Sequence, residues 1–398
     1  MVKAVRVVVV VVTRSFIRSA VLGCGLLLVL TGQAAVLPED RADVLYHSYD
    51  GGGMDINGPS VLVRKGDGKT YSAYYNYYVD NVSSASIDVV STGASPYVEE
   101  RVENGIGVEY LNGKSIMSVG YTSSVENDYV ADTVHFGVST DMFGDLTTVS
   151  LGFSRGSDSV YKMVKVGGVK VRDTAFGEKN TDRRTYSVGL TQILTKNMIM
   201  AANFETITDE GFLNNPYRQV RYDSGGTNGY TFENYPATRT SNALGLKFRY
   251  FLPYRAALHF YARTFADDWG ITANSYEVGY THPMGDSWIF DLRYRLYGQT
   301  SADFYRDLFS SVAELNYQAR DKELSTFSSS TIGIGISYEF AKSGWWFIEK
   351  GSANLVFDHF QFDYDNFRDY RIATPVLGEE PTYSFSANVL QLFVSIWY

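Results

Sequence analysis

Apolar side chains alternate with Gly, Ser, Thr and Asn at a period of two residues along most of the chain. Residues 332–338 are an example, because large apolar residues at every second position alternate with Gly333, Gly335 and Ser337. Successive side chains of a strand point to opposite faces, so this period indicates a strand with two unlike faces. Past residue 34, no apolar run approaches the length of a membrane-spanning helix. The sequence therefore predicts an all-β chain.

The composition is typical of strands that are apolar on one face and polar on the other. Aromatic residues make up 15% of the chain and Gly occurs 36 times, yet the mean hydropathy is only −0.15. Alternating strands combine these properties, since every second residue is polar. A soluble propeller or sandwich is the alternative, but the exposed face of such a sheet should be charged. The abundance of Gly, Ser, Thr and Asn favours a transmembrane barrel.

We expect residues 1–34 to be a cleaved signal peptide and residues 35–398 to form one barrel domain. Four basic residues precede an apolar run at 20–30, and small residues around Ala34 suit a signal peptidase. A membrane anchor at 7–30 is the alternative, but two arginines interrupt it, and each would cost a few kcal/mol at mid-helix.

Removal of this segment changes the balance of charge and leaves no thiol. The net charge moves from −9 to −13, because the segment holds four basic residues and no acidic ones. Such a chain is a poor partner for nucleic acid. The only cysteine, Cys24, lies in the segment, so the mature chain has no disulfide.

The connections between the alternating segments predict the topology. Short turns near residues 66, 112, 143, 196, 254, 285 and 343 are separated by longer polar segments at 81–97, 125–130, 158–181, 210–237, 301–327 and 364–382. Short periplasmic turns and long outer loops are expected of a transmembrane barrel, and bacterial barrels have an even number of strands. If the last strand ends in the periplasm, the count requires a first strand at about Ala42–Tyr49 and about 16 antiparallel strands in total.

The last strand keeps large apolar residues on one face to the end of the chain. They are Leu390, Leu392, Val394, Ile396 and Tyr398. This stretch resembles the C-terminal signature of bacterial outer-membrane barrels that the barrel-assembly machinery reads. The interpretation places the protein in the cell outer membrane of a Gram-negative bacterium as an exported multi-pass barrel. Its partners would then be membrane lipid, lipopolysaccharide and the assembly machinery, and Ala42–Tyr49 would pair with the last strand.

Aromatic residues at strand ends are expected to form interfacial girdles. They are Tyr49, Trp269, Trp288, Trp345, Trp346, Trp397 and Tyr398.

Several longer phrases of the sequence resemble one known family. They are the stretches 46–53, 83–90, 141–147, 207–218, 320–327 and 391–393. Together they make the chain similar to an uncharacterised proteobacterial family of outer-membrane β-barrels, catalogued as a domain of unknown function, number 3570. The resemblance implies a location and a fold. It implies no catalytic or binding residue.

Charged residues on the polar face would line the lumen. The candidates are Glu109, His135, Glu205, Lys247, Arg249, His259, Arg263, Glu277, Asp291, Arg293 and Arg295. Facing charges of opposite sign could select solutes, but a barrel interior must be polar in any case. Two close basic pairs, Lys247 with Arg249 and Arg293 with Arg295, are the places where a basic wall is expected first.

The sequence predicts no cofactor and no metal site. Acidic groups in the loops, at 126–128, 209–210 and 363–369, offer oxygen ligands, but their spacing matches no calcium loop. A solvated loop or contact with divalent-bridged lipopolysaccharide is the simpler interpretation. The five histidines are far apart, and no two have the spacing of metal ligands.

A passive channel or transporter for small polar solutes is the function that the sequence favours. A scaffold for a periplasmic or surface partner is the alternative, with the loops 158–181 and 210–237 as its binding surface. These loops are also long enough to fold into the lumen as a plug. A barrel-embedded hydrolase would need a serine beside His135. The Gly-x-Ser-x-Gly match at 152–156 continues an alternating strand pattern instead of forming the strand-to-helix turn of a nucleophile elbow. We therefore expect no enzymatic activity.

Overall fold

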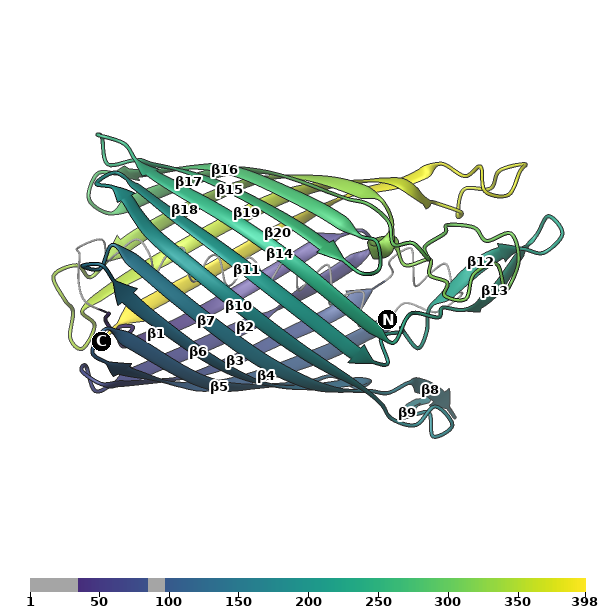
Figure 1. Ribbon diagram of the computed structural model, residues 1–398, viewed down its shortest axis with the longest axis horizontal. Coiled ribbons are helices and arrows are strands. Elements are labelled where there is room, and N and C mark those ends of the chain that lie inside the picture. Colours follow the sequence, from purple (N-terminus) through teal and green to yellow (C-terminus); the bar gives the residue numbers. More distant parts are fainter. Residues whose placement is uncertain (1–34, 85–96) are drawn as a thin grey trace.

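Sixteen antiparallel strands close into a barrel (Figure 1). The computed structural model describes residues 35–84 and 97–398. The barrel strands are β1 (Arg41–Gly51), β2 (Met54–Gly66), β3 (Tyr71–Ser84), β4 (Tyr97–Asn112), β5 (Ser115–Val125), β6 (Tyr129–Met142), β7 (Thr147–Val160), β10 (Lys179–Thr195), β11 (Met198–Gly211), β14 (Thr238–Phe251), β15 (Ala257–Asp267), β16 (Thr272–Met284), β17 (Trp288–Gln299), β18 (Phe327–Phe340), β19 (Lys350–Arg368) and β20 (Thr382–Trp397). The prediction of a 16-stranded antiparallel barrel is confirmed.

The first and last strands close the ring. β1 pairs with β20 along its whole length, from Arg41 opposite Trp397 to Gly51 opposite Ala387. This is the pairing that strand parity predicted. Closure leaves no strand with an unpaired edge, which is the condition for strands to cross a hydrocarbon layer.

The two ends of the barrel differ in their connections. Turns such as 67–70 and 113–114 join strands at one end, called here the short-turn end, where the chain also terminates (Figure 1). The opposite, long-loop end carries the connections 161–178, 212–237, 300–326 and 369–381. The predicted asymmetry of short turns at one end and long loops at the other is therefore present, but the predicted longer segment 125–130 is only a three-residue turn, 126–128. The predicted signal peptide and residues 85–96 of the predicted loop 81–97 lie outside the described residues.

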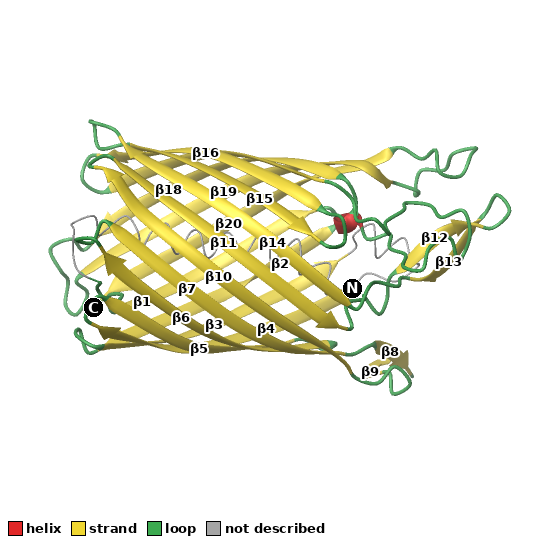
Figure 2. Ribbon diagram, in the orientation of Figure 1, coloured by secondary structure: helices red, strands yellow, loops and turns green. Residues whose placement is uncertain are grey.

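Two of these connections contain hairpins that extend away from the barrel (Figure 1). One consists of β8 (Met163–Val166) and β9 (Val169–Arg172), and the other of β12 (Gln219–Asp223) and β13 (Asn228–Phe232). In the connection 300–326, the short 3-10 helix η2 (Lys322–Leu324) lies at the rim of the barrel (Figure 2).

The outside of the barrel is apolar. On β6, for example, Val134, Phe136 and Val138 are exposed, and the residues between them point inward, as the pleat requires. Leu390, Leu392 and Val394 are likewise exposed on β20. Within residues 35–84 and 97–398, no helix is long and apolar enough to span a membrane.

The expected aromatic girdle is only partly correct. Trp288, Trp345 and Trp346 are exposed, but Tyr49 and Trp397 are buried. The reason is parity, because each of the last two alternates with outward-facing residues of its strand and so points inward.

Two other aromatic residues of that set also have protein contacts. Trp269 is buried in the turn between β15 and β16, where its Nε1–H donates to the carbonyl of Thr238 at 2.8 Å. The hydroxyl of Tyr398 donates to the carbonyl of Arg64 at 3.1 Å. Position at a strand end therefore did not by itself identify lipid-facing aromatics.

Replacement of Val44 and Val394 by cysteine, in a chain with Cys24→Ser, should yield a disulfide on mild oxidation. These residues are direct cross-strand partners, and directly opposite Cα atoms lie about 4.5–5.5 Å apart, within the range a disulfide spans. The bond would be detected as a change in gel migration that reductant reverses. The control pairs Val44→Cys with Leu390→Cys, displaced by four residues or about 13 Å along the strand. A bond in the control but not in the matched pair would contradict this closure.

Candidate functional site: barrel lumen and mouth

The wall formed by β4 to β7 and β10, called here the smooth wall, has mainly short side chains on its inner face. Its inward positions carry mainly residues with small side chains, such as Gly105, Gly107, Ser118, Gly120, Gly137, Ser150, Gly152, Ser154 and Gly189. Because such side chains are short, this wall leaves the interior open to larger side chains from elsewhere in the ring.

Tyr74 and His135 reach across this smooth wall. Strand register aligns Tyr74, Gly107, Gly120 and His135 in one row over β3 to β6. The Tyr74 hydroxyl and His135 Nε2 meet at 3.0 Å. A Cβ added to Gly107 would lie 2.4 Å from the Tyr74 ring, and one added to Gly120 would lie 2.1 Å from His135 Nε2. The two glycines therefore make room for this hydrogen bond.

The eleven lumen candidates all occupy inward positions, alternating with outward-facing residues of their strands. They are Glu109, His135, Glu205, Lys247, Arg249, His259, Arg263, Glu277, Asp291, Arg293 and Arg295. Nine of them belong to β11 and β14 to β17, which form a charged wall. β17 lies halfway round the ring from β5, so the charged wall faces part of the smooth one.

Several charges of the candidate set are paired. Glu109 pairs with Arg64 of β2, 2.5 Å apart. On the charged wall, Arg263 lies 3.4 Å from Glu205. His259 Nε2 lies 3.3 Å from Glu277, and this contact is an ion pair only when the imidazole is protonated.

Arg293 and Arg295 differ in their partners, although the sequence places them together. Arg293 Nε donates to Asp358 Oδ1 at 2.9 Å, and its second nitrogen bonds the other oxygen of the same carboxylate. Arg295 Nε donates instead to the hydroxyl of Ser275 at 3.0 Å. The predicted basic pair thus consists of Arg293, whose charge is neutralised by Asp358, and Arg295, whose hydrogen-bond partner is uncharged.

Three cations of the charged wall form no ion pair with any residue in 35–84 or 97–398. Among the described residues, no carboxylate oxygen lies within 4.0 Å of the charged nitrogens of Lys247, Arg249 or Arg295. Asp291 also lacks an ion pair in that part of the chain, but it accepts a hydrogen bond from Thr281 Oγ1 at 2.5 Å.

Gly333→Ala should destabilise the folded barrel by about 1–3 kcal/mol, the usual cost of overpacking. An added Cβ would lie 2.2 Å from Asp358 Oδ1 and 2.4 Å from Arg293 Nε, so the ion pair would have to move. The free energy of unfolding in urea, measured in lipid vesicles, would test this. Gly298→Ala is the control, because its Cβ would meet nothing within 4 Å. Equal stability of the two variants would exclude a tightly packed pair.

The connection 300–326, called here the mouth segment, packs into the long-loop end of the barrel. Its buried apolar residues join one cluster with inward-facing residues of β1 to β3, β19 and β20. The members from the mouth segment are Ala302, Phe304, Tyr305, Ala319 and Leu324. The Phe304 ring lies 5.1 Å from Trp269 and 5.6 Å from Tyr235, which come from two other connections. The mouth segment therefore fills interior space at this end.

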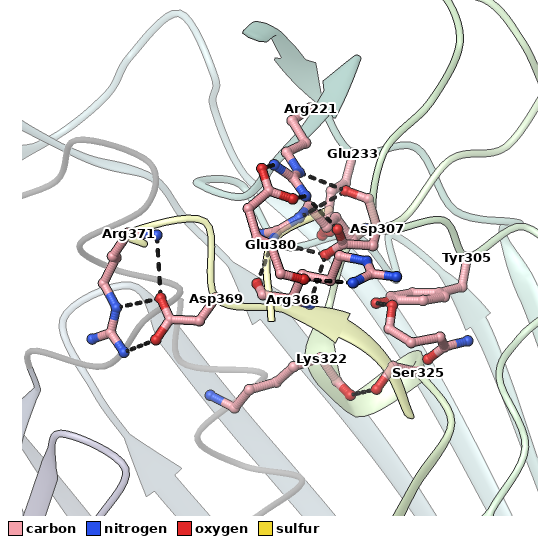
Figure 3. A network of polar contacts seen from close by, with 12 residues as sticks. Arg221, Glu233, Tyr305, Asp307, Lys322, Ser325, Arg368, Asp369, Arg371 and Glu380 are labelled. Atoms are coloured by element: carbon pink, nitrogen blue, oxygen red, sulfur yellow. Dashed lines mark hydrogen bonds and ion pairs between the residues drawn. The ribbon is translucent and has the colours of Figure 1, made fainter. Parts of the chain in front are cut away.

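A buried ionic network joins the mouth segment to two further loops (Figure 3). Arg221 of β12 forms ion pairs with Asp307 of the mouth segment and with Glu380 of the loop 369–381, the latter at 2.7 Å. Arg320 donates to Asp307 at 2.9 Å, and the backbone N–H of Arg368 reaches the same oxygen at 3.1 Å. The Arg221 side chain is 1% exposed. We name Arg221, Asp307 and Glu380 the mouth lock.

Burial of these charges makes the mouth lock selective for one loop arrangement. Removal of one partner of a buried ion pair typically costs about 3–5 kcal/mol, because the other charge is left unpaired. Backbone hydrogen bonds add to the connection, since Phe309 N–H donates to the Arg221 carbonyl at 3.0 Å.

The loop that packs into the barrel mouth differs from the two that the sequence analysis considered long enough to form a plug. The hairpin β8–β9, within the predicted plug 158–181, extends outward, and its residues Val166 and Val169 are exposed. The other predicted plug, 210–237, contributes Leu213 and Tyr235 to the mouth cluster, but its hairpin also projects. Sequence reasoning missed the mouth segment because its apolar residues follow no regular period.

Each of the three acidic loop groups considered as cation ligands has at least one residue with a basic partner. Glu126 lies 3.9 Å from Arg101, and Asp369 accepts two hydrogen bonds from the Arg371 guanidinium. Among the described residues, no group of three or more His, Cys, Asp or Glu side chains is placed to hold a metal ion.

Acidification should loosen the mouth segment. Burial, the largest single influence, raises the pKa of Glu380, but the hydrogen bonds and charge of Arg221 and backbone hydrogen bonds together outweigh it and hold the pKa below its ordinary value of 4.5. The stabilisation from Glu380 is therefore complete above that value and is lost as the pH falls through the lowered pKa. Hydrogen exchange of the mouth segment, corrected for intrinsic rates, should accelerate in this range, and Glu380→Gln should be loosened already at neutral pH.

The turn at Asp67 provides an internal reference for that measurement. Backbone N–H groups of Thr70, Tyr71 and Lys69 lower the pKa of Asp67 to about 2, so this turn should keep its protection until a lower pH. Loosening of both regions at the same pH would mean global unfolding and would contradict release of the mouth lock.

These features define a class of protein: a closed antiparallel barrel with an apolar exterior, a polar interior and a loop packed into one mouth. A family model described as "Protein of unknown function (DUF3570)" matches residues 67–353. The chain belongs to this family. A comparison with curated proteins finds no match.

Solved structures share the barrel fold at low sequence identity. A chain described as a bacterial polysaccharide outer membrane secretin is 8% identical with a TM-score of 0.50, over 90% of this chain and 99% of that one. The in-vitro folded outer membrane protein OmpT of Vibrio cholerae is 9% identical (TM-score 0.41; 90% and 97% of the two chains). The outer membrane protein opdK of Pseudomonas aeruginosa is 10% identical (TM-score 0.43; 91% and 100%). The first of these structures, at a TM-score of 0.50, identifies the fold as that of an outer membrane barrel.

Proposed function

We propose that the protein is an outer-membrane channel through which small polar solutes pass by diffusion along the lumen. The observation that carries the proposal is that the outer surface of the barrel is apolar and the inner surface is polar. Exposed residues such as Phe136 and Leu392 cover the outside, whereas ionised and hydroxyl side chains line the inside. Such a barrel is stable in lipid only if its interior stays hydrated or filled.

In this proposal, lipid and lipopolysaccharide surround the barrel after a signal peptide has directed its export. The assembly machinery reads the last strand, where Leu390, Leu392 and Val394 are exposed on one face. The outward positions of Ile396 and Tyr398 continue that face. No enzymatic reaction is part of the proposal.

The mouth segment would serve as the gate. It packs against the inner wall through an apolar cluster, and the mouth lock joins it to the loops on either side. Opening therefore requires separation of Arg221 from its two carboxylates and exposure of part of that cluster.

A scaffold is the second candidate, because the two projecting hairpins expose apolar residues. Val166, Val169 and Phe232 are each more than half exposed. An exposed apolar patch on a projecting loop is a common feature of a protein interaction site. A periplasmic partner would need access to the short-turn end, so these hairpins suit a surface partner.

Single-channel recording of the refolded protein in planar bilayers would test the channel. We expect small, infrequent openings for the unaltered protein. Arg221→Met should raise the time-averaged conductance by about tenfold or more, because it leaves Asp307 and Glu380 buried without their shared cation. The control is Arg371→Met, an arginine of the loop 369–381 whose side chain is 43% exposed, and it should resemble the unaltered protein.

The outcomes separate channel from gate. If neither the unaltered protein nor Arg221→Met carries current above the lipid background, the channel function is wrong. If both carry the same current, the channel stands and the mouth lock does not gate it.

A further inference from the structure

We propose that Lys247, Arg249 and Arg295 form a subsite for small oxyanions, such as phosphate or a carboxylate, on the charged wall. The inference rests on the proposed channel and specifies its solute class. It depends on which charges of the wall are already neutralised, and only the three-dimensional pairing provides that information.

Strand register places the three cations on two adjacent rows of the inner surface. Lys247, Tyr261, Glu277 and Arg295 are successive cross-strand partners on β14 to β17. Arg249 begins the next row toward the short-turn end. Lys247 and Arg295 are three strand spacings apart, roughly 14 Å. Their long side chains can therefore approach one solute from two sides.

The two side chains between them are turned away from this space. The hydroxyl of Tyr261 lies over Gly245 of β14, where an added Cβ would be only 3.0 Å from it. Glu277 pairs instead with His259, whose ring lies over Gly279 at 2.0 Å from a notional Cβ. The space between Lys247 and Arg295 is thus open to the ammonium and guanidinium groups of these two residues.

No acid in the described part of the wall forms a contact ion pair with these cations, although Glu277 attracts Lys247 and Asp291 attracts Arg249 from a longer distance. Glu205, Glu277 and Asp358 each lie within 3.4 Å of a basic partner outside the trio, and Asp291 accepts from Thr281. The three cations have no carboxylate within ion-pair distance in the described part of the chain. Cations outside ion-pair contact attract anions, as basic side chains do in anion-conducting pores.

Oxyanions are the class that fits this donor set. Guanidinium groups bind planar carboxylate or phosphate oxygens through two hydrogen bonds, and an ammonium adds a point charge. The opposite wall contributes hydroxyls, such as those of Ser118 and Ser150, which can solvate an anion but do not compete for the cations.

Reversal potentials in a tenfold KCl gradient would test the subsite, in the unaltered protein and in the Arg221→Met background. We expect the chloride-to-potassium permeability ratio to exceed one and to fall about threefold or more in Lys247→Gln/Arg249→Gln/Arg295→Gln. Inorganic phosphate should reduce the chloride current, and acetate should do so less. The triple variant should lose both effects.

Two further variants keep the test decisive. Lys165→Gln/Lys170→Gln/Arg172→Gln removes the same charge from the exposed hairpin β8–β9 and should leave the ratio unchanged. Lys247→Arg/Arg249→Lys retains the charge and should preserve the chloride preference. This variant also provides a test if the triple variant does not fold. An unchanged ratio in the triple variant, with current present, overturns the subsite alone. Absence of current from every variant removes the channel and the subsite together.

Discussion

Pairing of the first strand with the last is the constraint on which the rest of the structure depends. In hydrocarbon, a backbone amide without a partner costs several kcal/mol, so a sheet with free edges cannot cross it. The register of β1 on β20, with Val44 opposite Val394, removes both edges at once. The pairing register also decides which side chains point into the lumen and which point outward, because the side chains of paired residues on neighbouring strands lie on the same face of the sheet. Which charges share the lumen is therefore a consequence of closure.

Much of the fold was predictable because alternation is a local property. The apolar period of two, the turns and the parity of the last strand led to 16 strands and to the β1–β20 pairing. Inward positions followed in the same way, as the placement of Lys247 and Glu277 illustrates. The orientation of aromatic residues was harder to predict. Tyr49 and Trp397 lie near strand ends, but their positions in the alternation point them inward, and both are buried.

Loop packing was not predictable, and the physical reason is sequence distance. Arg221 and Glu380 are 159 residues apart, and no local pattern indicates that they meet. The same holds for Arg293 and Arg295, which look alike in sequence but differ in charge balance because Asp358 is two strands away from their own. Glycines were the overlooked signal: Gly107, Gly120 and Gly333 mark places where a large side chain from a neighbouring strand crosses the wall.

The mouth lock has a consequence for the order in which the protein forms. Its three residues come from β12, the mouth segment and the loop before β20, so they can assemble only after most of the strands have been placed. Contacts between distant residues form late, since the chain between them must be ordered first. In a first stage the barrel strands would be fully paired while the loops at the mouth are still unpacked, and the loops would adopt their final arrangement afterwards. Folding thus ends with the part that, in the working protein, would have to move first.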